Sequence, residues 1–230
     1  GIGEALFSGD VEIRRVGGET MNPRDEILER LKRNASNVEM PGAWQSQRDF
    51  PDLAERFTAS LTAVRGEVRR TETLETALIE VGTILDEISA QTVIANNEAP
   101  LAEARLDDRW PHRELYLVGK TPGDLREFCA RADAGLSGVE AALAETGSLV
   151  VHSGVGKSRL ATLLPPVHIA LVPVSCLEPD IFTWTASRNK EMPMPSNLNL
   201  ISGPSKSADI EFTLTLGVHG PKRLVVVLYD

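Results

Sequence analysis

Apolar residues recur along the chain with two different periods, and each period predicts one kind of element. Between residues 71 and 89 they follow one another at steps of three and four, as on the buried face of a helix: Leu74, Leu78, Val81, Leu85 and Ile88. Short apolar runs bounded by turn formers predict strands at 67–70, 92–95, 115–118, 148–152, 167–172, 198–201 and 223–229.

Further helices are predicted between these strands, at 52–65, 100–106, 121–131 and 177–186, and residues 134–139 and 140–144 are predicted to be extended. Strands that alternate with helices favour a largely parallel sheet covered on both faces. We therefore predict an α/β protein.

The first fifty residues have a different character. Residues 1–20 show no clear periodicity and precede Met21, so we expect an upstream extension. Asn22 is a candidate N-cap with Pro23 at the first helical position, and the polar stretch 34–50 resembles a linker. We expect a helix and linker at 21–50 and the main domain at 51–230.

The stretch from Leu200 to Tyr229 contains the strongest candidate for a ligand site. We predict a short helix that begins at the N-cap Ser207, carries Asp209 in its first turn and stops at Gly217. A Gly/Ser loop that opens a helix offers free N–H groups to an anion, although most such loops only turn and cap. The loop in question is Ser202-Gly203-Pro204-Ser205-Lys206-Ser207, and the turn His219-Gly220-Pro221 follows the helix.

A second glycine-rich stretch, Gly154-Val155-Gly156-Lys157-Ser158, resembles part of a nucleotide-binding P-loop. The full pattern needs a glycine at position 151, where this chain has Val151. The helix that should follow is cut short by Pro165-Pro166. We therefore predict a glycine-rich surface hairpin here.

Composition and charge exclude several classes of partner. The net charge of −9, from 24 basic and 33 acidic residues, argues against nucleic acid or an anionic membrane as the main partner. No apolar run reaches the roughly 18 residues of a membrane span, and the start of the chain lacks a signal-peptide pattern. These observations predict a soluble, cytoplasmic protein.

The chain carries little that suits a metal or a hydrolytic nucleophile. Cys129 and Cys176 have no CxxC spacing and cannot hold an iron–sulfur cluster or a structural zinc by themselves, so we expect buried free thiols. Neither an HxH pair nor a GxSxG elbow occurs. We expect no metal site and no cofactor on this chain.

Three stretches in the second half resemble one known family. They are Ala144-Glu145-Thr146-Gly147-Ser148-Leu149-Val150, Leu163-Leu164-Pro165-Pro166-Val167-His168-Ile169, and the run ISGPSKSADIEFTL followed by GVHGPK. The chain resembles the LUD-domain proteins, specifically the lactate-utilisation protein C (LutC/YkgG) family. The resemblance is specific over roughly 133–230, weaker over 21–132, and has no counterpart at 1–20.

This resemblance implies a three-layer α/β/α sandwich of the NagB/RpiA/CoA-transferase type, with the LUD domain at 51–230 and an N-terminal helical extension. It also implies a role in oxidising L-lactate to pyruvate, together with an iron–sulfur-containing partner and a second oxidoreductase partner. Because the chain has two cysteines and no dinucleotide fingerprint, the electron carriers would lie on those partners.

The candidate site residues each have an ordinary structural alternative. Glu145 could be an acid, base or nucleophile by analogy with the fold group, with Thr146 and Gly147 beside it, or it could simply form a turn. His168 could line a pocket or be a satisfied core residue, and His219 could shuttle protons or cap a helix end. Ligand contacts are predicted from Ser202, Gly203, Ser205, Lys206, Ser207, Asp209, His168, His219 and Lys222, although the two lysines could equally be solvated.

Three functions remain open on the sequence. The first is a subunit or accessory protein of a lactate-oxidising system, without its own redox centre, that binds a small carboxylate or other anion. The second is a stand-alone enzyme of the CoA-transferase or isomerase type that uses Glu145. The third is an interaction module whose loops contact a protein partner.

Overall fold

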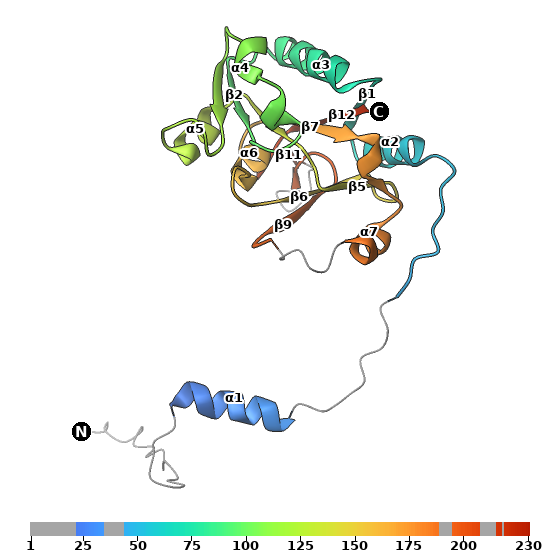
Figure 1. Ribbon diagram of the computed structural model, residues 1–230, viewed down its shortest axis with the longest axis vertical. Helices are drawn as coiled ribbons and strands as arrows, with labels where there is room; N and C mark the ends of the chain where they lie inside the picture. Colours follow the sequence, from blue (N-terminus) through green and yellow to red (C-terminus); the bar gives the residue numbers. More distant parts are fainter. Residues whose placement is uncertain (1–21, 35–43, 189–194, 208–214, 218) are drawn as a thin grey trace, which may run out of the picture. The chain divides into compact units, whose positions relative to one another are not determined.

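The computed structural model describes residues 22–34, 44–188, 195–207, 215–217 and 219–230, and it divides the chain into two units, Gly1–Ala43 and Trp44–Asp230. In the first unit, Pro23–Asn34 forms helix α1 (Figure 1). Asn22 Oδ1 accepts a hydrogen bond from the backbone N–H of Arg24 at 3.1 Å. The predicted N-terminal helix is confirmed, whereas residues 1–20 lie outside the described part.

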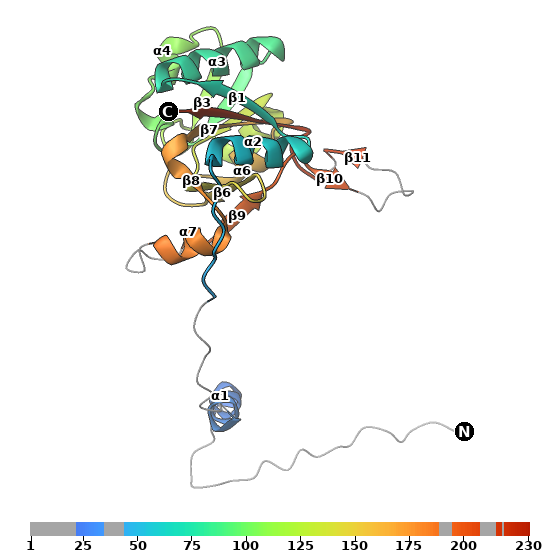
Figure 2. The ribbon, with the colours of Figure 1, turned by 90° about the vertical axis from the view of Figure 1, so that its right-hand side faces the viewer.

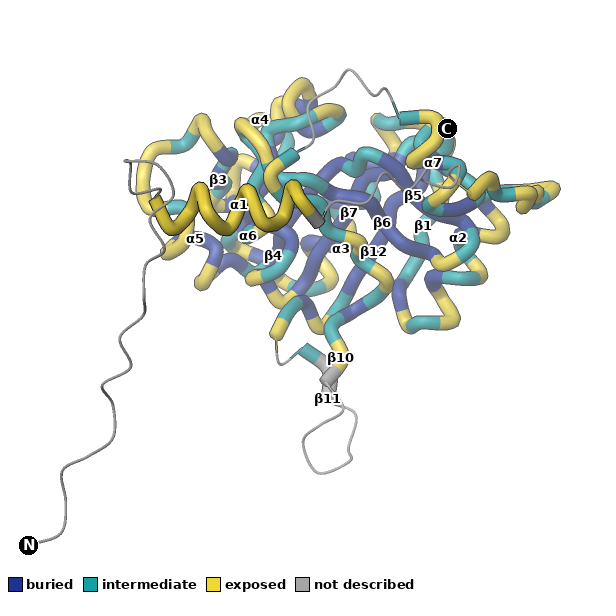
Figure 3. The backbone as a smooth tube through the Cα atoms, turned by 90° about the horizontal axis from the view of Figure 1, so that it is seen from below, coloured by how far each residue is buried: buried dark blue, intermediate teal, exposed yellow. Residues whose placement is uncertain are grey.

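Six parallel strands form the central sheet of the second unit. Their order is β1 (Glu67–Thr71), β12 (Arg223–Tyr229), β7 (Val167–Pro173), β4 (Ala134–Ser137), β2 (Thr92–Ala95) and β3 (Glu114–Leu117). The central strands are buried on both faces, as Figure 3 shows, which explains their nearly continuous apolar sequences. The predicted parallel sheet is confirmed.

Helices cover one face of this sheet. Helix α3 (Leu74–Glu87) packs Leu78, Val81 and Leu85 against it, together with η1 (Leu101–Glu103) and α4 (Leu106–Arg109). Thr73 and Thr76 form a capping box that fixes where α3 begins.

The opposite face is built differently from the predicted three-layer sandwich. It carries α2 (Leu53–Ala63), α5 (Leu125–Arg131) and α6 (Arg159–Leu163), and also a second sheet. That sheet is mixed, in the order β8 (Leu177–Glu178), β5 (Ala141–Leu143), β6 (Ser148–His152) and β9 (Leu198–Ile201). The 3-10 turn η2 (Val174–Cys176) leads from β7 into β8. The helix predicted at 177–186 is therefore wrong over 177–180, whereas a helix is found from residue 181 onward.

Helix α7 (Ile181–Ser187) covers the far side of the second sheet, as Figure 1 shows. Its Trp184 packs against Ala141, Leu143 and Val150. Both sides of the second sheet are thus apolar, and the sequence 141–151 lacks the alternation that marks a strand with one wet face.

The helix predicted from Ser207 to Gly217 is contradicted at both of its ends. Lys206–Ser207 (β10) and Thr215–Leu216 (β11) pair as antiparallel strands (Figure 2). Residues 208–214, which include Asp209, lie outside the described part. The sequence supports the correction, since apolar residues at 210, 212, 214 and 216 alternate with polar ones at the period of a strand.

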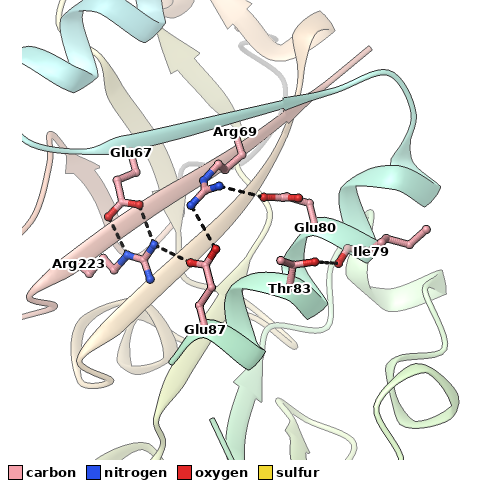
Figure 4. Close-up of polar contacts among 7 residues, drawn as sticks. All are labelled: Glu67, Arg69, Ile79, Glu80, Thr83, Glu87 and Arg223. Carbon is pink, nitrogen blue, oxygen red and sulfur yellow. Dashed lines mark hydrogen bonds and ion pairs between the residues drawn. The ribbon is translucent and has the colours of Figure 1, made fainter. Parts of the chain in front are cut away.

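An ion-pair network ties β1 and β12 to α3 (Figure 4). Arg223 binds both carboxylate oxygens of Glu67 at 2.7 Å and reaches Glu87 Oε2 at 3.2 Å. Arg69 in turn contacts Glu87 and Glu80 at 3.4 and 3.5 Å. The hydrogen bonds from Arg223 lower the pKa of Glu67, partly opposed by burial.

We expect Arg223→Met to lower the free energy of unfolding by about 1–2 kcal/mol, because it breaks a bidentate pair that holds three elements. The lowered pKa of Glu67 means that its contribution is present above its ordinary value of 4.5 and is lost as the pH falls through the folded-state value. Urea unfolding at neutral and acid pH measures both effects. Arg105→Met, which breaks an exposed pair with Asp108, is the control and should change stability by less than about 0.5 kcal/mol.

Candidate functional site

A cavity of about 200 Å³ lies at the amino ends of β7 and β12, on the face that carries the second sheet. We call it the His168 cavity. It is lined by residues of α6, β7, β9, β12 and the two loops that precede β10 and β12: Thr162, Leu163, His168, Leu200, Ile201, Ser202, Gly203, Ser205, His219, Gly220, Pro221 and Leu224. Ligands of open α/β sheets usually bind at the carboxyl ends of the strands, so this cavity lies at the opposite edge.

His168 and Thr162 are the two most deeply buried polar residues of the cavity lining, each with 1% of its surface exposed. The Nε2 of His168 lies 2.8 Å from Ser137 Oγ, whereas Nδ1 is buried and has no hydrogen-bond partner among the described residues. Burial lowers the pKa of His168 to about 4, so the imidazole is neutral at physiological pH. A neutral ring with one unpaired nitrogen can bind a ligand through a hydrogen bond.

Hydroxyl groups form a chain that ends at the cavity. Ser202, which lines the cavity, has its Oγ 2.5 Å from Ser148 Oγ, and Ser148 Oγ lies 2.7 Å from Thr146 Oγ1. Ser148 is buried and Thr146 is exposed. Each hydroxyl can donate or accept a hydrogen bond, so this series of hydroxyls can present either a donor or an acceptor to a bound group.

Two backbone hydrogen bonds fix the loops around the cavity. Ser205 N–H donates to the carbonyl of Pro221 at 2.8 Å, and Gly217 N–H donates to the carbonyl of Ser205 at 2.9 Å. Gly203 has a φ of 97°, and a Cβ there would lie 2.9 Å from the carbonyl oxygen of Val64. The glycine therefore permits the loop to pack against the end of α2.

The described lining of the His168 cavity contains no Asp, Glu, Lys or Arg. Its polar groups are hydroxyls and two imidazoles, and five lining residues are Leu, Ile or Pro: Leu163, Leu200, Ile201, Pro221 and Leu224. Such a cavity suits a small molecule with an apolar body and one polar end, and it lacks the cations that a polyphosphate needs.

The sequence of the second unit matches the model of one protein family. The match is to the LUD domain and spans residues 54–229. The chain belongs to the LUD-domain family. The resemblance found in its C-terminal motifs is confirmed.

Comparison with individual proteins shows which LUD-domain relatives this chain resembles. It is 35% identical over 185 residues to Lactate utilization protein C of Halalkalibacterium halodurans, covering 77% of this chain and 79% of the relative. It is 44% identical over 112 residues to the protein of the same name from an Exiguobacterium species, covering 46% and 48%. A crystal structure of a DUF162 family protein from Deinococcus radiodurans has the same fold, with a TM-score of 0.52 and 20% identity over 77% of this chain and 96% of the other.

Five of the predicted site residues of this LUD-domain chain line the cavity together: His168, Ser202, Gly203, Ser205 and His219. The turn Glu145-Thr146-Gly147 does not. Glu145 Oε1 pairs with Arg48 Nη2 at 2.8 Å, and the backbone carbonyl of Glu145 accepts a hydrogen bond from Ser60 at 3.1 Å. The turn packs on α2, and among the described contacts the hydroxyl chain connects it to the cavity.

The predicted lysine contacts are not found at the cavity either. Lys206 donates from Nζ to the carbonyl of Val64 at 2.7 Å, where a cation suits the carboxyl end of α2. Lys222 is exposed and is absent from the cavity lining. The side chain of Ser207 and the whole of Asp209 lie outside the described residues.

Sequence reasoning missed most of the cavity wall. Thr162, Leu163 and Leu200 come from elements whose apolar pattern indicates only burial, and Leu224 is one residue of a uniform buried strand. Leu200 is 46% exposed on β9, and only the structure shows that this leucine lies at a cavity.

Two further findings bear on the class of protein. Within the described ranges, no group of three or more His, Cys, Asp or Glu side chains is placed to hold a metal ion. Among those same residues, no helix has the length and apolar character needed to cross a membrane.

Proposed function

We propose that this LUD-domain protein takes part in the utilisation of L-lactate as a subunit or accessory protein, with its redox centres on partner proteins. The proposal is supported by its membership of the LUD-domain family and by relatives named Lactate utilization protein C. The chain has only two cysteines, Cys129 and Cys176, so an iron–sulfur cluster would lie on a partner.

The ligand of the His168 cavity, in this proposal, is a short monocarboxylate. Its apolar part would contact Leu200 and Leu224, and its carboxylate would accept hydrogen bonds from His168 Nδ1–H and from Ser202 or Ser205. When the Ser137 hydroxyl donates to Nε2 of His168, the proton of the neutral ring stands on Nδ1. A single negative charge can be held by neutral donors, whereas a larger charge would stay uncompensated.

The alternative is an enzyme of the CoA-transferase or isomerase type with Glu145 at its centre. In the structure this carboxylate is paired with Arg48 and lies away from the cavity. No described contact favours the alternative, so it is kept only as a possible result of an activity screen with a Glu145→Gln control.

The role in lactate utilisation is tested in the cells that produce this chain. We expect a deletion strain to lose growth on L-lactate and to regain it when the chain is supplied again. A tagged chain should also co-purify a brown, cluster-containing partner that absorbs between 300 and 500 nm. Unimpaired oxidation of lactate in cells that lack the chain would refute the proposal.

We expect Leu200→Trp to weaken monocarboxylate binding at least about tenfold, because the indole ring fills the cavity. Position 200 on β9 is exposed and therefore tolerates the larger side chain. Titration of lactate, pyruvate and butyrate against both proteins by NMR measures the change. Ile79→Trp adds a ring at another exposed site, on α3, and should leave binding as it was. Equal binding by the two variants would place the ligand elsewhere.

A further inference from the structure

The glycine-rich stretch 154–158 lies at the opposite edge of the sheet from the His168 cavity. Gly154 and Lys157 form an antiparallel bridge, so the predicted surface hairpin is confirmed. Asn97 N–H donates to the carbonyl of Gly156 at 2.8 Å, and Ser158 N–H donates to Asn96 Oδ1 at 2.9 Å. Because residues 96 and 97 directly follow β2, the hairpin is held at the carboxyl end of that strand.

This location is a switch point of the fold. The sheet order places β2 between β4 and β3, and the chain leaves β2 for β3 on one side and then continues to β4 on the other. In open α/β sheets, crevices for ligands form outside the carboxyl ends of strands at such points. The position next to β2 and β4 is therefore one where the fold favours a ligand site.

Three side chains beside the hairpin form a hydrogen-bonded series. Lys157 Nζ lies 3.1 Å from His152 Nε2, and His152 Nδ1 lies 2.7 Å from Glu140 Oε2. The contact with Glu140 places the proton of a neutral imidazole on Nδ1 and leaves Nε2 as an acceptor. The three side chains are 27%, 24% and 22% exposed, so they are sheltered but accessible.

An amine, a base within hydrogen-bond reach of it and a third group that orients the base are the parts of an activated nucleophile. We propose that Lys157 is a nucleophile toward a small polar aldehyde or ketone, with His152 as its base and Glu140 as the residue that positions His152. None of these residues lines the His168 cavity, so the inference does not depend on the proposed function.

The step is an imine formation without any redox change. Lys157 gives a proton to His152 Nε2, and the free amine adds to the carbonyl carbon. The carbinolamine then loses its hydroxyl as water, taking back a proton, and a C=N bond replaces the C=O bond. Glu98, whose Oε2 lies 3.3 Å from Lys157 Nζ, stands beside the cationic imine that forms.

Unpaired polar atoms next to the series supply contacts for the substrate. Asn97 Oδ1 and Ser153 Oγ are buried and have no hydrogen-bond partner among the described residues. Asn97 is bonded to Gly156, next to Lys157, and Ser153 follows His152 in the chain. Buried polar atoms without a partner are uncommon in proteins and call for an explanation. A hydroxyl group on the carbonyl compound could donate to Asn97 Oδ1 or accept from the Ser153 hydroxyl.

The test is to incubate the full chain with glycolaldehyde, a small aldehyde that carries a hydroxyl group, and with sodium cyanoborohydride, which reduces imines, and to follow each lysine by peptide mass spectrometry. We expect Lys157 to be modified at least about tenfold faster than the exposed Lys120 and Lys222. A rate at Lys157 equal to or below that of Lys120 would overturn the proposal.

Variants separate activation from simple exposure. We expect His152→Gln to bring the rate at Lys157 down to that of Lys120, and Glu140→Gln to lower it while Glu140→Asp restores part of the loss. His112→Gln replaces an exposed histidine and is the matched control, which should leave the rate unchanged. Unfolding curves confirm that each variant is folded, and an unchanged rate in folded His152→Gln would also refute the assignment.

Discussion

Replacing Gly147 with alanine is expected to lower the free energy of unfolding by more than about 3 kcal/mol, from backbone strain and overpacking together. Gly147 has a φ of 66°, and a Cβ at this position would lie 2.3 Å from the backbone nitrogen of Leu61. Neither the turn nor α2 can move freely, because Ser60 bonds to the carbonyls of Ala144 and Glu145. Denaturant unfolding followed by circular dichroism measures the loss.

The matched control is Gly154→Ala. An added Cβ at Gly154 meets no atom within 4 Å, and its φ is not positive, so the change should stay within about 0.5 kcal/mol. If Gly147→Ala were as stable as this control, the turn at 145–147 would not be held against α2 as described.

The second large effect concerns His168 and pH. We expect the wild-type protein to lose roughly 2 kcal/mol more stability than His168→Gln between pH 7 and pH 5. The pKa of His168 is lowered to about 4 in the folded state by burial, from an ordinary value of 6.5. Between these two values the unfolded chain binds the proton and the folded chain does not, so stability falls as the pH falls.

Urea unfolding of both proteins at several pH values tests this difference, since all other titrating groups are common to them. Glutamine keeps a polar group that can reach Ser137 but has no proton to gain in this range. Parallel curves for the two proteins would show that His168 is not buried as a neutral ring. A carboxylate ligand in the His168 cavity should reduce the difference in pH dependence between the two proteins, because it gives Nδ1 a partner that favours the protonated ring.

The main sheet was predictable because its strands have a simple physical cause. In the main sheet, Thr92–Ala95 and Arg223–Tyr229 were predicted with the bounds that the structure gives, and so were Ser148–His152 and Leu198–Ile201 of the second sheet, since apolar runs between turn formers have few alternatives. What was not predicted is that β6 and β9 form a separate sheet with the short strands β5 and β8. Nothing local distinguishes a strand that joins the main sheet from one that starts another.

The candidate site was predictable as a stretch but not as a set of contacts. Ser202, Gly203, Ser205 and His219 line one cavity because the turn chemistry brought their loops together. The contact of Lys206 with the carbonyl of Val64, at the carboxyl end of α2, was not predictable, because that helix lies far away in the sequence. The same limit applies to Lys157, whose neighbours His152, Glu140 and Glu98 come from three separate segments.

The place of β12 in the sheet has a consequence for how the protein is made. Within the described part of the chain, strand β1 pairs only with β12, with Glu67 opposite Val225. On its other side, β12 pairs with β7. During translation, β1 therefore has no partner strand until residues 223–229 have left the ribosome. A nascent chain that already carries β7 exposes an unpaired apolar edge for that whole period, which favours aggregation. Synthesis of this protein should depend on chaperones that shield strand edges, and slower translation should increase that dependence.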